Sequence, residues 1–358
     1  MRTILKGKGS NFVVDDAPTF DYPEKKKKTQ TISFINPPYV AGRAAVVGEK
    51  EGKGPIGKYF HVVKADDKNG EKTFEKAEID MLEQALGIAT DVLSDKTNDL
   101  DLVISGDLLN QITTSSYVCR SFDVPFLGVY SACSTLSESI AIASSMINVG
   151  YFKTIACCTA SHFATAERQY RYPLEYGCQR PPYSQWTATA AGCTVLSSEY
   201  KSGVAVTKAT FGKVIDYGLN DLNNMGAAMA PAAFDTIKAF FHDTNTTPSD
   251  YDLIVTGDLG KLGSDILRAL MSEYGMPLGR NYVDCGSLLY YVDQHCYQGA
   301  SGAGCSASAV NSFVLEKMEQ GEYSKVLYFA TGALMSTQSC YQGETIPCIS
   351  HGVLFERR

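Results

Sequence analysis

Two short stretches of the chain carry nearly the same pattern of apolar and polar residues. Residues 101–108 read DLVISGDL and residues 252–259 read DLIVTGDL, so each is an apolar run that follows an acidic residue and ends in Gly-Asp. This pattern is typical of a buried strand that ends in a turn. Residues 151–157 and 323–329 also match each other, each a short strand after a helix-like segment. The repeat predicts two similar halves that share one core.

Strands and helices alternate along the first half. Apolar residues at three- and four-residue spacing predict amphipathic helices over 77–93 and 136–147. Further apolar runs predict strands at 101–106, 126–130, 153–159, 188–196 and 203–211, with a short helix near 114–121. The Gly- and charge-rich segment 42–58 is interpreted as a loop.

The second half repeats this order. We expect a helix over 229–242 with Pro231 in its first turn, because proline is well suited to that position. The remaining pattern predicts a strand at 252–256, a helix near 262–273, a Gly-rich entry at 299–304 into another helix, and strands at 325–331 and 352–356. Such alternation indicates mostly parallel sheets covered by helices, an α/β fold. Its predicted parts are a flexible charged arm (1–28), a first half (29–212) and a second half (213–358).

Composition excludes several classes of protein. The formal net charge of −7 argues against nucleic-acid binding, which needs a basic face. We expect neither a membrane span nor secretion, since no run of 18 apolar residues and no signal-peptide core is present. The 11 cysteines are scattered and form no C-x-x-C pair, so a reduced, cytoplasmic setting without a metal site is expected. The run Lys25 to Lys28 is either a solvated tail or a weak contact to an anionic membrane.

Cys133 is the side chain most suggestive of chemistry. It stands between a predicted buried strand and the first turn of a helix. There the free N–H groups and the positive end of the helix dipole favour a thiolate or another bound anion. The alternative is a packed thiol at a tight turn, and position alone leaves both open.

At this point the residues resemble a known superfamily. A duplicated βαβα half, a cysteine that opens the third helix, and the closing stretch 348–355 (CISHGVLF) are similar to thiolases and condensing ketoacyl synthases. Within this superfamily, the sequence motifs are more similar to those of one member, the stage V sporulation protein AD family. The resembling segments are 104–111 (ISGDLLNQ), 131–139 (SACSTLSES), 161–173 (SHFATAERQYRYP), 226–237 (GAAMAPAAFDTI) and 346–356 (IPCISHGVLFE). The resemblance covers about residues 30–358 and implies a thiolase-like fold, layered α-β-α-β-α.

The resemblance also locates groups that a condensing enzyme would need. In ketoacyl synthases a His follows the first strand of the second half, where residues 256–258 here read Thr-Gly-Asp. A second His or Asn stands in the Gly-rich turn, which here reads GASGAG over 299–304. Losing both removes oxyanion donors, worth about 3 kcal/mol each, and the general base. We therefore expect a protein that binds rather than converts, with no cofactor.

Dipicolinic acid, a flat pyridine with two carboxylates, is the ligand that the resemblance implies. One carboxylate could sit at the helix that begins near Ser134. A guanidinium, from Arg168 or Arg171, could hold the other, although Arg168 could equally pair with Glu167. Aromatic rings interleaved with these arginines could stack on the pyridine or form a dimer cap: Tyr170, Tyr172, Tyr176, Tyr183 and Trp186.

Other candidates complete the expected ligand site. Asp258 ends a strand equivalent to that of Asp107, and each is interpreted as a turn cap or a polar pocket wall. Ser301 in the Gly-rich turn, Cys348 and His351 in the closing strand, and Cys133 itself are placed beside the ligand. His162 either lines this pocket or is a structural histidine bonded to backbone. An acyl-transfer enzyme that uses Cys133, His162 and Cys348 is the alternative function.

The resemblance implies partners as well. It associates the family with the membrane subunits of a spore channel for dipicolinic acid or its calcium salt, so ligand binder and scaffold could coexist. Attachment to the forespore inner membrane is then expected through those partners. Thiolase-like chains pair by joining sheets edge to edge, and strand 153–159 is the expected seam of a homodimer.

Overall fold

The structure is a computed structural model that describes residues 29–95, 99–170, 180–200 and 203–358. The arm predicted over residues 1–28 lies outside these described residues.

The first half builds one mixed sheet. Its strands run in the order β2, β8, β6, β4, β5. β4 is parallel to β5 and β6, and β8 is antiparallel to β6 and β2. The bounds are β2 (Tyr39–Val47), β4 (Leu102–Asp107), β5 (Phe126–Gly128), β6 (Thr154–Ser161) and β8 (Ala190–Ser197). β2 covers the start of segment 42–58, so the loop predicted there is wrong for residues 42–47.

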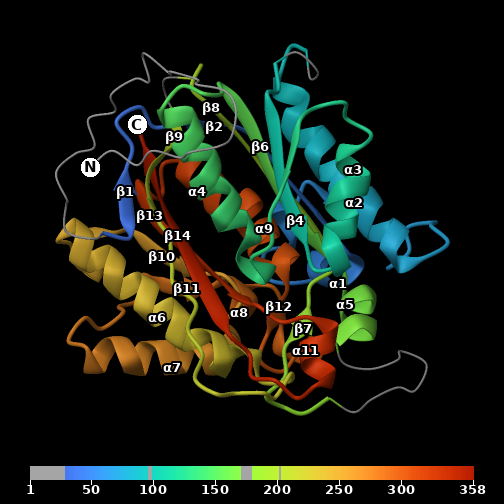
Figure 1. The fold of residues 1–358 in the computed structure, drawn as a ribbon, viewed down its shortest axis with the longest axis vertical. Helices are drawn as coiled ribbons and strands as arrows, with labels where there is room; N and C mark the ends of the chain where they lie inside the picture. Colours follow the sequence, from blue (N-terminus) through green and yellow to red (C-terminus); the bar gives the residue numbers. More distant parts are fainter. Residues whose placement is uncertain (1–28, 96–98, 171–179, 201–202) are drawn as a thin grey trace, which may run out of the picture.

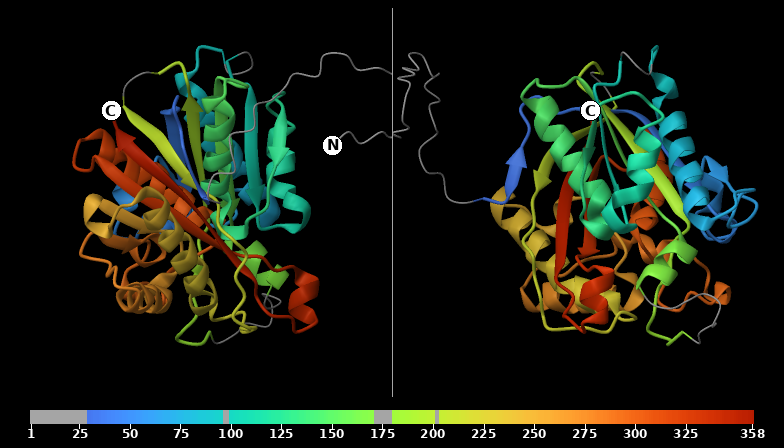
Figure 2. Two further views of the ribbon diagram at one scale, coloured as in Figure 1. Left: turned by 60° about the vertical axis from the view of Figure 1, so that its left-hand side comes forward. Right: turned by 45° about the vertical axis from the view of Figure 1, so that its right-hand side comes forward.

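The second half builds a sheet with the same plan. Its order is β11, β10, β13, β14, β9, which repeats the first sheet strand for strand in chain order. The bounds are β9 (Val204–Thr210), β10 (Leu253–Thr256), β11 (Tyr282–Asp284), β13 (Lys325–Ala333) and β14 (Cys348–Arg357). Both views of Figure 2 show these strands (yellow to red) to one side of the first-half strands. The predicted duplication is confirmed at the level of topology.

β9 belongs to the second half rather than the first. It pairs with β14 over most of its length, whereas within the described chain it pairs with β2 at one position, Tyr39 with Ala205. The boundary predicted at residues 212 and 213 therefore moves to the segment between β8 and β9. The short strands β1 (Thr31–Ser33) and β3 (Val62–Val63) extend the sheets at β9 and β2.

Helices separate and cover the two sheets. Figure 1 shows α2 and α3 on one side of the molecule, α6 and α7 on the other, and α4 and α9 between the sheets. Their bounds are α2 (Phe74–Ala89), α3 (Thr113–Cys119), α4 (Thr135–Asn148), α6 (Met225–Thr244), α7 (Gly260–Glu273) and α9 (Ala303–Ala309). The order across the molecule is α-β-α-β-α, as the resemblance implied.

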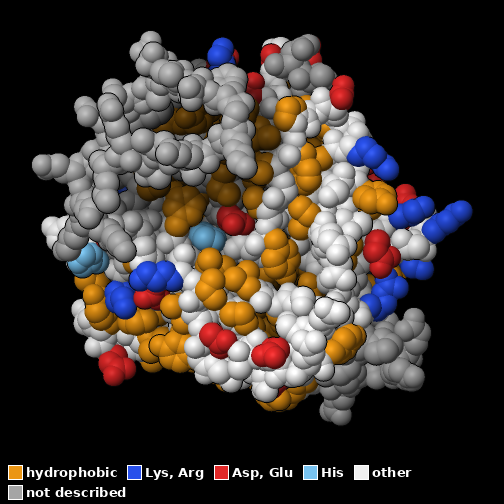
Figure 3. Space-filling view, in the orientation of Figure 1, with side chains coloured by type: hydrophobic (Ala, Val, Ile, Leu, Met, Phe, Trp, Pro, Cys, Tyr) orange, Lys and Arg blue, Asp and Glu red, His pale blue; other side chains and the backbone are white. Residues whose placement is uncertain are grey.

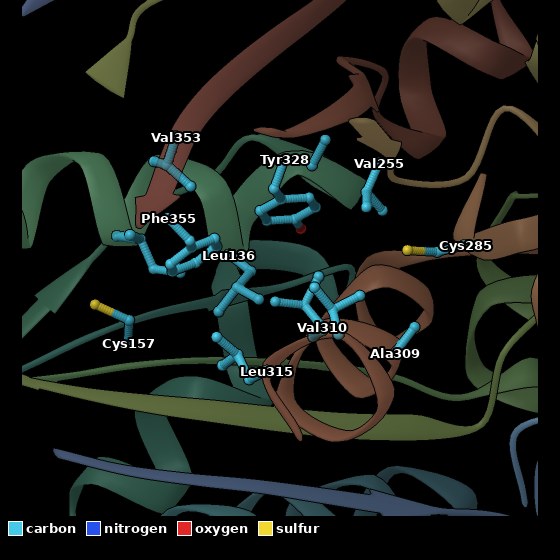
Figure 4. Close-up of a cluster of buried hydrophobic side chains, with 14 of the residues drawn as sticks. Leu136, Cys157, Val255, Cys285, Ala309, Val310, Leu315, Tyr328, Val353 and Phe355 are labelled. Carbon is cyan, nitrogen blue, oxygen red and sulfur yellow. The ribbon is translucent and has the colours of Figure 1, made fainter. Parts of the chain in front are cut away.

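Strand alternation explains these layers, because successive side chains point to opposite faces. In β6, Ala156 and Cys158 pack against α2, while Ile155 and Cys157 face the central layer. The central core joins both sheets, with Leu136 of α4 and Val310 packed among Tyr328 and Phe355 (Figure 4). A third cluster lies between α6, α7 and the second sheet. The central cluster, which contains residues of both halves, therefore holds them together.

In two helices, a capping side chain and tertiary packing explain where the helix begins and how its interior accommodates proline. α2 begins at Phe74 because the Thr73 side chain accepts a hydrogen bond from the Lys76 N–H at 3.3 Å. α6 begins at Met225, so Pro231 lies inside the helix and not in its first turn as predicted. Tertiary packing of the buried α6 outweighs the hydrogen bond that proline removes.

The remaining elements are short. They are α1 (Glu49–Gly52), α5 (Phe163–Tyr170), β7 (Trp186–Thr187), α8 (Cys285–Leu288), β12 (Ala300–Ser301), a π-helical turn (Val310–Val314), α10 (Leu315–Glu319) and α11 (Thr337–Tyr341).

Within the described ranges, no helix is both long enough and apolar enough to cross a bilayer. On the face drawn in Figure 3, apolar side chains gather across the middle, and Lys and Arg lie toward the margins.

β6 cannot be the seam of a dimer. It lies between β4 and β8 and is paired along both edges. The outer strand of the first sheet is β5, which pairs with β4 on one side. The expectation for strand 153–159 is therefore wrong, because sequence order does not reveal which strand ends a sheet.

Candidate functional site

A pocket lies where the two halves meet, with about 450 Å³ of empty space that includes the solvent at its open side. First-half elements supply one side of it and second-half elements the other. The lining is mostly apolar and aromatic: Leu108, Tyr130, Ala132, Cys133, Ala166, Tyr170, Thr187, Met225, Met229, Ser301, Gly302, Ala333 and Met335. None of these residues is Lys or Arg, so the described wall carries no positive side chain.

Cys133 opens onto this cavity from a strained turn before α4. It sits in a single 3₁₀ turn (Ala132–Ser134), and Ala132 has a left-handed φ of 48°. The backbone of β13 packs directly on this turn, since a Cβ at Gly332 would lie 2.0 Å from the Ser131 carbonyl oxygen. The predicted strand-to-helix position of Cys133 is confirmed, and the thiol is 8% exposed.

The Cys133 thiol interacts with the carboxylate of Asp258, which stands at the end of β10. Asp258 Oδ2 accepts hydrogen bonds from Ser301 Oγ and the Gly302 N–H, both at 3.0 Å. Its Oδ1 accepts from Thr331 Oγ1 at 3.2 Å. Asp258 is thus held by the Gly-rich turn before α9 and by β13, and its carboxylate reaches across to Cys133 of the first half.

This carboxylate makes the thiol a poor nucleophile. Burial first, and then the negative charge of Asp258, raise the pKa of Cys133 well above its usual range. Burial also raises the pKa of Asp258 to about 6, against the lowering effect of its hydrogen bonds. A catalytic cysteine needs the opposite surroundings, a cation or imidazole that stabilises the thiolate.

Asp107 and Asp258 end equivalent strands but do different things. Asp107 accepts from the N–H groups of Leu109 and Ser115 at 2.9 and 2.8 Å, and from Ser115 Oγ at 2.7 Å. It therefore caps its own turn and α3, which confirms one of the two interpretations. Asp258 instead bonds Ser301 and Gly302, which line the cavity. The two aspartates therefore have different partners, although the local sequences match.

Ser301 lies at the cavity as expected, on the Gly-rich turn before α9. Gly302 has φ 100° and ψ 160°, a conformation that only glycine adopts readily, and a Cβ there would lie 2.7 Å from Ser161 Oγ. The turn thus presents Ser301 Oγ and the Gly302 N–H to Asp258, in the region where ketoacyl synthases carry an imidazole or amide.

Ser134, Cys348 and His351 are not among the residues that line the cavity, so the structure does not bring them together with Cys133 there. Ser134 Oγ donates to the Ser131 carbonyl at 2.7 Å and so stabilises the turn. Cys348 is buried in the outer core beside α6, and burial raises its pKa to about 12. His351 Nδ1 accepts from the Gly212 N–H at 3.4 Å, and burial lowers its pKa to about 4.

His162 is a structural histidine. Its Nε2 is 2.7 Å from the Asp67 carbonyl oxygen, and its Nδ1 accepts from the Ala164 N–H at 3.1 Å. The ring packs on Phe74 at 5.4 Å between centroids, and burial lowers its pKa. The expectation that His162 lines the Cys133 cavity is therefore wrong, because the chain turns into α5 and directs the ring toward α2.

Arg168 also lies outside the cavity lining. It forms an ion pair with Glu75 at the surface and stacks over Phe74 at 5.6 Å. The structure therefore does not place Arg168 at this cavity, because its guanidinium pairs with Glu75 of α2. Arg171 lies outside the described residues, as do Tyr172 and Tyr176. Among the aromatic candidates, Tyr170 lines the cavity, while Trp186 stacks on Phe163 at 3.7 Å.

The sequence did not reveal most of the apolar lining. Met225 and Met229 are four residues apart on α6, so they share one face. Tyr130 stands three residues before Cys133, and its hydroxyl donates to the Met335 carbonyl at 3.1 Å. The methionine pair was a usable signal, but Met335 enters from a loop that no periodic pattern predicts. Within the described ranges, no three His, Cys, Asp or Glu side chains are grouped to hold a metal ion.

Comparison with known proteins agrees with this geometry. A family model described as Stage V sporulation protein AD matches residues 28–356. The chain is 43% identical over 328 residues to stage V sporulation protein AD of Bacillus subtilis (strain 168), covering 92% of this chain and 97% of the relative.

Solved structures share the fold at low identity. 3-Oxoacyl-acyl-carrier-protein synthase III from Aquifex aeolicus VF5 has a TM-score of 0.55 at 14% identity, covering 89% of this chain and 99% of that one. Human mitochondrial 3-ketoacyl-CoA thiolase in complex with CoA has a TM-score of 0.55 at 10% identity, covering 91% and 99%. The chain therefore belongs to the stage V sporulation protein AD family, a family of sporulation proteins, and has the fold of thiolases and ketoacyl synthases.

Proposed function

We propose that this protein binds dipicolinic acid in the cavity beside Cys133 and supports its uptake into the developing spore. Membership of a sporulation family supports the setting. The cavity supports binding, because it is concave, largely apolar and flanked by Tyr130 and Tyr170, whose rings can contact a flat pyridine.

One observation carries the choice of binding over catalysis. The Cys133 thiol meets the carboxylate of Asp258, which keeps the thiol protonated, and no imidazole is among the described residues that line the cavity. A condensing reaction needs a thiolate and a proton acceptor together. The site retains the room for a ligand without the groups that would react with it.

Acyl transfer is the second candidate. It is favoured by the position of Cys133 at the opening of α4, where the helix dipole faces the cavity. The arrangement proposed from sequence, with His162 as the base, has no support in the position of His162. Acyl transfer would need a reactive Cys133, so the reactivity of this thiol separates the two functions.

Filling the cavity tests the binding proposal. We expect sodium dipicolinate to give heat in calorimetry at up to millimolar concentration, the regime of about −4 kcal/mol. Ala166→Phe should abolish that heat, because it places a ring into the lining. Arg168→Ala, on the same helix but paired with Glu75, should leave affinity unchanged. No heat from the wild-type protein, or equal heat from Ala166→Phe, would contradict the proposal.

We also propose a homodimer joined at β5. The Val103 N–H bonds to the Pro125 carbonyl, and the Val129 N–H bonds to the Ser105 carbonyl. The alternation of a strand therefore directs the backbone N–H of Phe126 away from β4. The β5 edge is also apolar, with Phe126 36% exposed and Tyr117 of α3 50% exposed.

Sedimentation tests this seam. At tens of micromolar the wild-type protein should have about twice the chain mass of 38.8 kDa. Phe126→Pro removes the outward N–H and should give monomers, whereas Phe126→Val keeps it and should remain dimeric. A monomeric wild type, or a dimeric Phe126→Pro, would contradict the seam at β5.

The proposed cellular role needs partners. We propose that the protein attaches to the forespore inner membrane through the membrane subunits of a dipicolinate channel. Co-purification of those subunits with the tagged protein from sporulating cells should succeed, and its failure would remove this part of the proposal.

A further inference from the structure

The cavity beside Cys133 reaches the surface at one place in its wall. Every described residue that lines it is buried except Tyr130, which is 40% exposed, and Met335, which is half-buried. An occupant that lies among buried residues has to enter where the wall meets solvent. The mouth of the cavity is therefore at Tyr130 and Met335.

A second pocket, here called the outer pocket, lies against this mouth. It has about 680 Å³ of empty space, open solvent included. Tyr130, Tyr170 and Met335 line both the cavity and the outer pocket, so these side chains form the partition between them. The other lining residues come from the segment after β4, from the end of β5 and from the segment after β13: Leu109, Asn110, Gln111, Ile112, Gly128, Val129 and Ser336.

The two tyrosines of the partition are held in different ways. The Tyr130 hydroxyl donates to the Met335 carbonyl at 3.1 Å, which joins the segment before α4 in the first half to the segment after β13 in the second. The Tyr170 hydroxyl donates to the Leu108 carbonyl at 2.7 Å, and both of these residues belong to the first half. The bond of Tyr130 therefore crosses the mouth, whereas the bond of Tyr170 fixes one wall.

The bond across the mouth can open without unfolding either half. A neutral hydrogen bond that water can reach is readily exchanged for bonds to water. Tyr130 meets this condition because it is partly exposed, and Tyr170 does not because it is 6% exposed.

Strained backbone lies at the rim of the outer pocket. Gln111 and Ile112 both line it, and their φ values of 56° and 49° are left-handed. For a β-branched residue such as Ile112, this conformation is an outlier. Strain of this kind persists only where the surrounding structure imposes it, and it is common at ligand clamps and switch regions. The rim therefore gives a second indication, independent of burial, that this side of the molecule has a role beyond folding.

We propose that the ligand of the cavity enters and leaves through the outer pocket, and that the bond between Tyr130 and the Met335 carbonyl is a latch that sets the rate of exchange. Opening the latch moves the Tyr130 ring out of the partition and joins the two pockets. Closing it encloses the occupant. The identity of the occupant rests on the proposed function, whereas the position of the mouth does not.

Labelling of Cys133 tests the mouth and the latch without any ligand. Methyl and benzyl methanethiosulfonate both convert a thiolate to a mixed disulfide, so the ratio of their rates cancels the thiolate fraction and reports the size of the passage. Tyr130→Ala should raise the benzyl-to-methyl ratio several-fold, and Tyr130→Phe should raise it by a smaller factor. Tyr274→Ala is the control, because Tyr274 is 44% exposed and lies outside both pockets. Unchanged ratios in both Tyr130 variants overturn the inference.

Release of dipicolinate tests the latch by its rate. Excess terbium traps the released ligand as a luminescent chelate. Tyr130→Phe keeps the ring but cannot donate to the Met335 carbonyl, so release should be about two- to tenfold faster, the range that one neutral hydrogen bond supplies, and association should be faster by the same factor. Tyr251→Phe is the control, since it removes a hydroxyl that is hydrogen-bonded to Thr246 outside both pockets.

The outcomes separate this inference from the proposed function. Faster release at an unchanged association rate overturns the latch, because it would show that the Tyr130 hydroxyl bonds the ligand itself. Equal rates in Tyr130→Phe and wild type overturn it as well. Absence of dipicolinate binding to the wild type overturns the proposed function, and the labelling ratios then decide the mouth and the latch by themselves.

Discussion

At pH 8, iodoacetamide is expected to modify Cys133 of the folded protein much more slowly than a free thiol. Only the thiolate reacts, and each unit by which the pKa exceeds its usual value costs tenfold in rate. Burial and the Asp258 carboxylate both raise the pKa of Cys133. Peptide mapping by mass spectrometry resolves Cys133 from the other cysteines over a time course.

Asp258→Asn should raise this rate, because it removes the charge next to the thiol, which lowers the pKa of Cys133, and leaves the shape of the side chain. Asp107→Asn is the matched control, since Asp107 directs its carboxylate into the turn at Leu109 and Ser115. Rapid labelling of the wild-type Cys133 would contradict the account. So would an adduct from acetyl-coenzyme A in intact mass that Cys133→Ser removes, and this result would favour acyl transfer.

Between pH 5 and pH 8, the free energy of unfolding of Glu78→Gln should rise relative to wild type by about 2–4 kcal/mol. Glu78 on α2 is buried, its Oε2 accepts from Thr165 Oγ1 at 2.8 Å, and its Oε1 has no hydrogen-bond partner. Burial, followed by the nearby charge of Asp107, raises the pKa of Glu78 to about 8.

The sign follows from proton binding. A carboxyl whose pKa is raised by folding holds a proton in the folded state that the unfolded chain has released. Its stabilising contribution is present below the unfolded pKa and is lost as pH rises to the folded value of about 8. Glutamine does not ionise, so the variant escapes this loss.

Urea unfolding followed by circular dichroism at pH 5, 6, 7 and 8 measures the effect. Glu75→Gln is the control on the same helix, because Glu75 pairs with Arg168 at the surface and should contribute less than about 1 kcal/mol. Parallel pH dependences for wild type and Glu78→Gln would show that Glu78 ionises normally in the folded protein. Other buried carboxyls with raised pKa act in the same direction in wild type: Glu51, Asp258 and Asp284.

The sequence predicted the order of elements well, because each strand and helix has a local signature. The matching runs at 101–106 and 252–256 became β4 and β10, and the helical stripe from 136 became α4. A local signature does not show which strands pair with a given strand in the sheet. Local sequence therefore predicts neither that β9 pairs mainly with β14 nor that β6 is an interior strand paired along both edges.

Local sequence likewise predicts some residues of the candidate site and misses others. The position of Cys133 followed from the strand and helix beside it, and Ser301 followed from the Gly-rich turn. His162 and Arg168 did not reach the cavity, because their partners, the Asp67 carbonyl and Glu75, are distant in sequence and nearer in space. Asp258 and Asp107 have the same local sequence, Gly-Asp-Leu, which cannot show that one of them meets a thiol from the other half.

The joint between the sheets has a mechanical consequence. β2 and β9 pair at one position in the described chain and β1 adds three pairs to β9, so backbone pairing between the halves is short and the packing of the central core contributes most of the contact between them. The walls of the cavity are drawn from both halves, with Cys133 and Tyr170 on one side and Met229 and Ser301 on the other. An occupant therefore bridges the joint, and any sliding of one sheet past the other changes the room it has. We therefore expect an occupied cavity to resist such sliding.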